Sequence, residues 1–235
     1  MEYSSVSIAG KRRHNEDSCL ATRIKDGLLM AVADGVGGHA AGDVASAIAV
    51  ETLRSEFTKN YLADMGAGDV KKLLKNIFSM ADDNVSDKAT GEMSGMATTL
   101  VAAFVRDLEV FIANTGDSRA YVFDGSLRQI TVDHSLVQEL VDKGDIEPEK
   151  RQTHPLKNVI TRSIGGDFSV DIYHIGIKAG DILLLSSDGL HDYIGDDLIS
   201  ERLKSAESAN GTARMLVKSA IPVSEDNISV VILKR

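Results

Sequence analysis

Two of the four Asp-Gly pairs in the sequence, Asp34-Gly35 and Asp188-Gly189, stand where catalytic sites are commonly built. Each follows a short apolar run of the kind that forms a buried strand. The other two pairs, at positions 26 and 124, lie in polar surroundings between strand-like runs, which is typical of hairpin turns. We therefore expect the carboxylates of Asp34 and Asp188 to emerge from strand ends at a functional site.

Further acidic side chains recur at junctions between expected strands, namely Glu16, Asp17, Asp117 and Asp226. Several carboxylates at one end of a sheet repel one another, and a divalent cation removes that cost. Oxygen ligands without Cys or clustered His select hard ions such as Mg²⁺ or Mn²⁺. A solvated loop position is the simpler interpretation of any one of these acids, but the set together favours a metal site.

Other catalytic chemistries lack their motifs. Arg23 follows Cys19 too closely for the phosphate-binding loop of a Cys-based phosphatase. The glycine cluster Gly37, Gly38 and Gly42 precedes an expected helix but lacks the Lys-Ser/Thr of a P-loop. The 6 histidines are isolated, without His-Glu-x-x-His spacing, which argues against a zinc hydrolase.

The elements that must position these acids follow from hydrophobic periodicity. Expected strands cover residues 28–33, 97–105, 109–113, 120–123, 182–185 and 228–233, and expected helices cover 44–57, 70–85, 136–142, 196–205 and 212–220. Two consecutive long helices followed by strands without helices do not fit a strict βαβ alternation, which argues against a doubly wound parallel sheet. We predict an α+β layered fold with helices on both outer faces of packed sheets, and a polar surface flap over residues 134–166.

Composition sets the broad class of the protein. The chain has 235 residues, a formal charge of −9, 43% hydrophobic residues and a single cysteine, Cys19. These values indicate an ordinary globular protein, and the absence of a signal peptide or a long apolar segment predicts a cytoplasmic location without membrane contact. An acidic surface disfavours nucleic acid, and it also repels a phosphorylated substrate unless the binding site is locally positive.

Seven short motifs follow one another along the chain. They are residues 10–17 (GKRRHNED), 33–39 (ADGVGGH), 95–100 (GMATTL), 116–119 (GDSR), 133–135 (DHS), 187–190 (SDGL) and 226–229 (DNIS). Each motif alone is weakly informative, but their shared order is specific. In this order they resemble the metal-dependent type 2C Ser/Thr protein phosphatases, especially their compact bacterial-type catalytic domain, and the resemblance extends from about residue 7 to residue 233.

The resemblance implies a four-layer α-β-β-α sandwich with a dinuclear metal site at one edge of the β-sandwich. The implied ligands of Mg²⁺ or Mn²⁺ are Glu16, Asp34, the Gly35 carbonyl, Asp117, Asp188 and Asp226. Within this set Asp34 bridges the two core ions, Glu16 and Gly35 complete one of them, and Asp188 and Asp226 hold the other. Asp117 joins Asp188 at a weaker third ion, and Asp17 orients bound water.

The resemblance also implies the mechanism. A water shared by two cations attacks phosphorus directly, so no phosphoenzyme forms. Arg12 is the expected phosphate clamp, although the motif spacing leaves the adjacent Arg13 as an alternative. His39 is the expected general acid for the departing Ser or Thr oxygen, the alternative being a glycine-loop histidine without a proton role. We expect His191, which follows the Asp188 motif, to lie at the surface, the alternative being a position close to the metals.

We therefore predict a protein-serine/threonine phosphatase that acts in signalling, opposes a partner Ser/Thr kinase, and consists of a single catalytic domain over residues 1–235. We expect a monomer. The alternative is a non-catalytic phosphoprotein-binding regulatory module with the same fold, which the complete ligand set disfavours. A two-metal nuclease would share the acids, but the charge of −9 and the lack of a Lys/Arg-rich stripe count against it.

Overall fold

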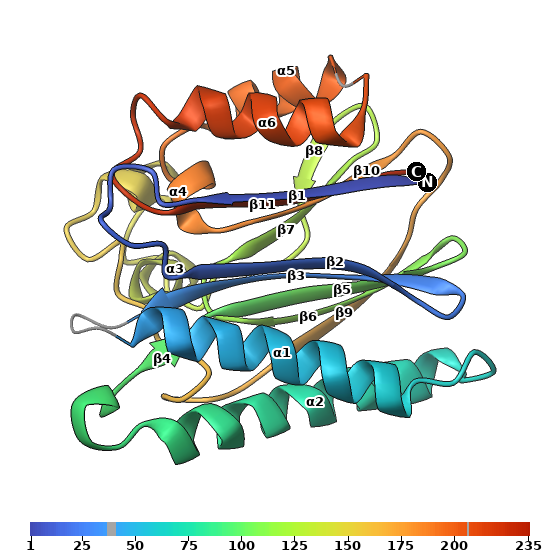
Figure 1. Ribbon diagram of the computed structural model, residues 1–235. Helices are drawn as coiled ribbons and strands as arrows, with labels where there is room; N and C mark the ends of the chain where they lie inside the picture. The colour runs from blue at the N-terminus through green and yellow to red at the C-terminus, as the bar shows by residue number, and fades with distance from the viewer. Residues whose placement is uncertain (37–40, 206) are drawn as a thin grey trace.

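Two antiparallel sheets packed face to face form the centre of the computed structural model, which describes residues 1–36, 41–205 and 207–235 (Figure 1). One sheet has the order β1-β11-β10-β7-β8, and the other has the order β2-β3-β5-β6-β9, with β4 paired to β3. The strands are β1 (Glu2–Ile8), β2 (Asp17–Ile24), β3 (Gly27–Val36), β4 (Ala97–Thr98), β5 (Leu100–Arg106), β6 (Glu109–Thr115), β7 (Arg119–Phe123), β8 (Leu127–Gln129), β9 (Asp171–Gly176), β10 (Ile182–Ser186) and β11 (Ile228–Lys234).

The central strands are apolar along their whole length because both of their faces are buried. In β3, Leu28, Met30 and Val32 belong to the core between the two sheets. The alternate residues Leu29 and Ala31 belong to a second core under the helices. This arrangement explains why residues 28–33 read as a continuous hydrophobic run instead of an alternating one.

Helices cover the outer face of each sheet (Figure 1). On the β3 side, α1 and α2 pack through a cluster in which the Phe57 ring lies 4.7 Å from that of Phe104. On the β11 side, α5 and α6 pack over Leu184 and Ile232. The helices are α1 (Gly42–Asn60), α2 (Ala67–Lys88), α3 (Leu136–Asp142), α4 (Asp188–His191), α5 (Asp196–Lys204) and α6 (Ala209–Ala220), with 3₁₀ turns η1 (Gly91–Met93) and η2 (Pro148–Thr153). The predicted α+β fold with four α-β-β-α layers is confirmed.

Some boundaries differ from the sequence-based expectation. The strand expected over residues 97–105 is divided into β4 and β5 at Thr99, where the Asp34 N–H donates to the Thr99 hydroxyl. The register against β3 is the same on both sides of this break. The four edge strands β1, β2, β8 and β9 are missing from the predicted set, since most of their residues are only partly buried or exposed and they carry no continuous apolar run. None of the helices in the described parts of the chain combines the length and apolar content needed to cross a membrane.

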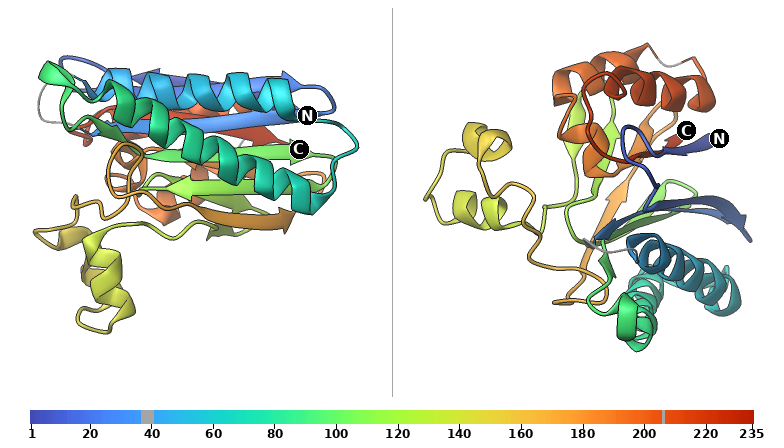
Figure 2. Two further views of the ribbon diagram at one scale, coloured as in Figure 1. Left: turned by 90° about the horizontal axis from the view of Figure 1, so that it is seen from below. Right: turned by 60° about the vertical axis from the view of Figure 1, so that its left-hand side comes forward.

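The segment that follows β8 leaves the four layers and projects to one side, carrying α3 and η2 (Figure 2). An isolated β-bridge between Thr98 and Ile164 ties it to β4, and a second one, between Ser135 and Ile160, joins the two ends of the segment to each other. The segment lies at the end of the sandwich that also carries β4 and α4, whereas both chain termini lie at the opposite end (Figure 1). The predicted flap region therefore stands beside the loops that carry the predicted acids.

Candidate active site

A pocket of about 260 Å³ lies at this end of the sandwich. It contains all of the implied metal ligands and the predicted clamp Arg12, although they come from chain segments more than 200 residues apart. Its lining residues are Arg12, Glu16, Asp34, Gly35, Val36, Asp117, Asn158, Ile160, Asp188, Asp226 and Asn227.

Asp34 is held in place through its own backbone near the end of β3. Its N–H donates to Thr99 Oγ1 at 2.9 Å, and its carbonyl accepts from the Thr99 N–H and from Thr98 Oγ1, each at 2.9 Å. The Thr99 hydroxyl also lies 2.7 Å from the Ser118 hydroxyl, next to Asp117. The two threonines of the 95–100 motif therefore fix Asp34 and connect it to the loop of Asp117.

Close backbone approaches bring the Asp188 and Asp226 segments together. A Cβ on Gly189 would lie 1.9 Å from the Asn227 carbonyl oxygen, so only glycine allows α4 to approach the start of β11 this closely. The register of β1 against β11, with Ile8 opposite Ile228, places the chain after β1 beside the chain before β11. Both features converge on the Asp226-Asn227 pair.

Asn227 joins these segments through its side chain. Its amide nitrogen donates to the carbonyls of Ala9 and His14, each at 2.9 Å, and its Oδ1 accepts from the Glu16 N–H at 2.9 Å. We did not assign this residue a role from the sequence, although its place in the 226–229 motif was a signal. The same is true of Gly42 in the glycine cluster, where a Cβ would lie 3.1 Å from the Glu16 carboxyl carbon and 2.9 Å from the Gly35 carbonyl oxygen.

Four carboxyl groups of the pocket have raised pKa values. Burial, followed by the charges of neighbouring aspartates, raises the pKa of Asp34 and the pKa of Asp117 well above the usual range. The same two causes raise the pKa of Asp188 to about 7. Burial raises the pKa of Glu16 as well. A cation in the pocket would offset both causes.

Asp17 lies opposite Asp34 across the β2–β3 ladder. Burial raises its pKa to about 6. Its Oδ2 accepts a hydrogen bond from the Ser187 hydroxyl at 2.8 Å, and that hydroxyl accepts from the Ser229 N–H at 3.0 Å. Oδ1 of Asp17 and Oδ1 of Asp188 are buried without a hydrogen-bond partner among the described residues. Such oxygens are costly unless a water or an ion engages them.

Arg12 is the basic residue that faces these acids. Its Nη2 lies 2.8 Å from Asp226 Oδ2 and its Nε donates to the Glu225 carbonyl at 3.1 Å, while 55% of its side chain is exposed. The charge of Asp226 raises the pKa of Arg12 further above its usual value. Arg13 lines the adjacent pocket around His14. The predicted general acid, His39, lies outside the described residues.

The oxygen-only donor set and the unpartnered buried oxygens fit hard divalent cations. Within residues 1–36, 41–205 and 207–235, however, no group of three or more His, Cys, Asp or Glu side chains is arranged to hold an ion as it stands. The carboxylates would have to move closer together around a cation. The fit therefore rests on donor chemistry and burial.

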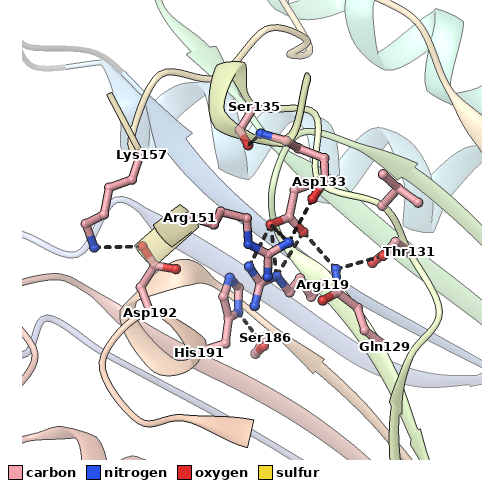
Figure 3. A network of polar contacts seen from close by, with 12 residues as sticks. Arg119, Gln129, Thr131, Asp133, Ser135, Arg151, Lys157, Ser186, His191 and Asp192 are labelled. Carbon is pink, nitrogen blue, oxygen red and sulfur yellow. Dashed lines mark hydrogen bonds and ion pairs between the residues drawn. The ribbon is translucent and has the colours of Figure 1, made fainter. Parts of the chain in front are cut away.

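A second polar network lies next to the pocket and anchors the projecting segment (Figure 3). Asp133 accepts from Arg119 Nε at 2.8 Å and from Arg119 Nη2 at 2.6 Å, and Arg151 of η2 lies 3.8 Å from the same carboxylate. A few residues further on, Lys157 pairs with Asp192 at 2.9 Å. Ion pairs from two points of the segment thus hold it against the sandwich.

His191 belongs to this network, and the prediction of a surface position for it is wrong. Its side chain is buried, its Nδ1 lies 2.9 Å from the Ser186 hydroxyl, and its ring faces the Asp117 backbone. Burial, together with Arg119 and other nearby cations, lowers the pKa of His191 well below its usual value. The single turn of α4 directs this side chain inward between β10 and the network, which the Asp188 motif alone did not indicate.

Comparison with known proteins gives the family. A family model described as protein phosphatase 2C matches residues 7–225. The chain belongs to the protein phosphatase 2C family. It is 39% identical over 231 residues to the serine/threonine phosphatase stp of Listeria monocytogenes, covering 95% of this chain and 91% of that protein. The predicted family and enzyme class, protein-serine/threonine phosphatase, are confirmed.

Solved structures of similar proteins agree with the fold of this protein phosphatase 2C. The serine/threonine phosphatase Stp1 from Staphylococcus aureus superimposes with a TM-score of 0.94 at 34% identity, covering 100% of this chain and 95% of that one. The catalytic domain of the serine/threonine protein phosphatase PstP, crystallised in complex with two manganese ions, gives a TM-score of 0.84 at 34% identity, with 98% and 96% coverage.

Proposed function

We propose that this protein phosphatase 2C hydrolyses phosphoserine and phosphothreonine in proteins with two Mg²⁺ or Mn²⁺ ions in the acidic pocket. The observation that carries the proposal is the convergence of the whole implied ligand set on one pocket, in which burial and neighbouring charges raise the pKa values of Asp34 and Asp188. The manganese-bound PstP domain supports the choice of metal. We further propose that residues 1–235 act as a single, monomeric catalytic domain that opposes a partner Ser/Thr kinase, with the flap over residues 134–166 beside the substrate.

We propose the ligand roles that the family resemblance implies, and the shared pocket of these residues supports them. Asp34 would bridge the two core ions, Glu16 and the Gly35 carbonyl would complete one, Asp188 and Asp226 would complete the other, and Asp117 with Asp188 would hold a weaker third ion. When bound, the cations supply Lewis-acid chemistry by neutralising phosphate charge and lowering the pKa of water.

The other side chains bind the phosphate and hold protons. Arg12 is half exposed at the pocket and presents a planar set of N–H donors, which can exchange Asp226 for two phosphate oxygens. Asp17 keeps Oδ2 on the Ser187 hydroxyl and has Oδ1 available to accept a hydrogen bond from the attacking water. His39 would donate the proton to the departing Ser or Thr oxygen.

Asp34→Asn tests the metal assignment. We expect hydrolysis of a phosphopeptide in Mn²⁺ to fall by at least about 10²-fold, because several kcal/mol of transition-state stabilisation depend on the cations. The matched control is Asp64→Asn, in the exposed loop between α1 and α2, which should leave the rate unchanged. EDTA should abolish activity of the unmodified protein and Mn²⁺ should restore it. Full activity of Asp34→Asn would refute the ligand role, and absence of any turnover would favour the phosphoprotein-binding alternative.

His39→Gln tests the general acid. An alkoxide leaving group needs a proton, whereas an activated aryl phosphate does not. The variant should therefore lose roughly 10²-fold or more in kcat on a phosphoserine peptide and much less on the aryl phosphate. Steady-state kinetics on both substrates measure the difference. Equal losses on the two substrates would contradict proton donation by His39.

A further inference from the structure

His134, the central residue of the 133–135 motif, forms two hydrogen bonds with the loop that carries Asp117. The proposed mechanism assigns no role to His134. The Gly116 N–H donates to His134 Nδ1 at 3.1 Å, and the His134 N–H donates to the Gly116 carbonyl at 3.1 Å. Gly116 has a φ of +104°, and a Cβ there would lie 2.6 Å from Thr99 Cβ. The backbone just before Asp117 is thus confined between Thr99 and the His134 ring.

The other ring nitrogen of His134 faces the base of the flap. Nε2 lies 3.1 Å from Asp171 Oδ2 at the start of β9. Because Nδ1 accepts from a backbone N–H, the ring proton is on Nε2 and donates to Asp171. Arg162, 3.3 Å from Nε2, then has Asp171 Oδ1 at 3.4 Å as its acceptor. Burial of His134 lowers its pKa, which favours this neutral ring.

His134 also lies where the flap segment leaves and rejoins the sandwich. The Thr161 N–H donates to the His134 carbonyl at 2.9 Å, and the Leu136 N–H donates to the Val159 carbonyl at 2.8 Å. The side chain of His134 is 5% exposed, whereas those of its partners Asp171 and Arg162 are 42% and 40% exposed. A buried ring therefore connects an accessible ion pair at the flap base to the Asp117 loop.

We propose that His134 is a positioning residue that fixes Asp117 toward the metal pocket by holding the backbone of Gly116, and that Asp171 orients the ring for this task. The inference deepens the proposed function, on which it rests, because it concerns the weaker ion that Asp117 would hold. The proposal predicts that a side chain replacing His134 preserves the affinity of the Asp117 site for this ion only if it places a hydrogen-bond acceptor at the position of Nδ1.

Two conservative variants separate the two ends of the ring. In His134→Asn the amide lies near the position of Nδ1 and can accept from the Gly116 N–H, whereas in His134→Gln it lies near Nε2 and cannot. In a calorimetric titration with Mn²⁺, we expect His134→Gln to weaken the weakest binding step by about 10-fold or more, as loss of a partner behind a metal ligand commonly does. His134→Asn should retain most of the affinity. With an aryl phosphate at fixed Mn²⁺, kcat should follow the same order and KM should change little.

Controls distinguish positioning from general stabilisation. His174→Asn, on β9 and paired with Glu109, should leave Mn²⁺ binding unchanged. Asp171→Ala removes an accessible carboxylate and leaves His134 itself in place, so it tests the orienting contact even if both His134 variants unfold. It should weaken the same binding step.

The proposal would be overturned by equal Mn²⁺ affinities of His134→Asn and His134→Gln, or by unchanged Mn²⁺ binding in Asp171→Ala. It would equally be overturned by His134 variants that lose thermal stability but bind Mn²⁺ like the unmodified protein. Absence of Mn²⁺-dependent turnover in the unmodified protein would count against the proposed function instead. The binding titration needs no turnover and would still decide the role of His134.

Discussion

At the scale of single residues, Asp188 shows how strongly the site opposes the stability of the metal-free fold. Its Oδ1 is buried without a hydrogen-bond partner among the described residues, and burial followed by the charge of Asp226 raises its pKa from 3.8 to about 7. Between about pH 4 and pH 7 the folded chain therefore holds a proton that the unfolded chain releases. The contribution of Asp188 to stability thus falls as the pH rises through this window.

Asp188→Asn should raise the thermal midpoint of the protein in EDTA at pH 8, and this gain should shrink toward pH 4. Each unit of pKa shift corresponds to about 1.4 kcal/mol, so a gain of a few kcal/mol is expected at the upper end. Thermal unfolding at several pH values measures it, with Asp64→Asn as the control. If the Asp188→Asn protein is no more stable than the unmodified one at pH 8, the ionised Asp188 carboxylate does not destabilise the metal-free fold.

At the scale of elements, the site depends on how closely α4 approaches the start of β11. Gly189 lets the Asp188 turn pack on the Asn227 carbonyl, and Asn227 in turn holds the chain around Glu16. The flap is attached to the same end by ion pairs such as Arg151 with Asp133 (Figure 3). Short elements joined by close backbone contacts, more than the long helices, therefore set the positions of the acids.

Gly189→Ala should lower the free energy of unfolding by about 1–3 kcal/mol and weaken Mn²⁺ binding, because the added methyl group must push Asp188 away from Asp226. Gly68→Ala in α2 is the matched control, since a Cβ there meets nothing within 4 Å. It should be neutral or slightly stabilising. Urea unfolding and a Mn²⁺ titration provide the two measurements. Normal Mn²⁺ affinity in Gly189→Ala would argue against the close approach as a determinant of the site.

At the scale of the whole molecule, the acidic residues behind the net charge of −9 are not spread evenly over the surface. Part of the negative charge lies in one pocket, where cations can make the local field favourable for phosphate while the remaining surface stays acidic. The antiparallel pairing of β1 with β11 places Arg12 beside Asp226, 214 positions away in the chain. A long-range sheet contact thus builds the charged end of the sandwich.

The layered fold and most of the chemistry could be inferred from residue order alone. Burial on both faces of a strand leaves a continuous apolar run, as in residues 28–33, and the acids at the strand ends indicated metal chemistry. The resemblance of the ordered motifs to a known family indicated a phosphatase, and the family match confirms it. Such patterns are local, because they reflect the repeat of a strand or a helix and the residue types within one loop.

The identity of the neighbours in the pocket required the folded chain. The position of Arg12 over Asp226, the inward turn of His191 and the bridging role of Asn227 all depend on contacts between segments far apart in sequence. The unpartnered oxygens of Asp17 and Asp188 are likewise a property of burial. Sheet register and the close backbone contacts that glycine permits determine which of these residues become neighbours. Neither produces a periodic pattern in the sequence of the segments that it brings together.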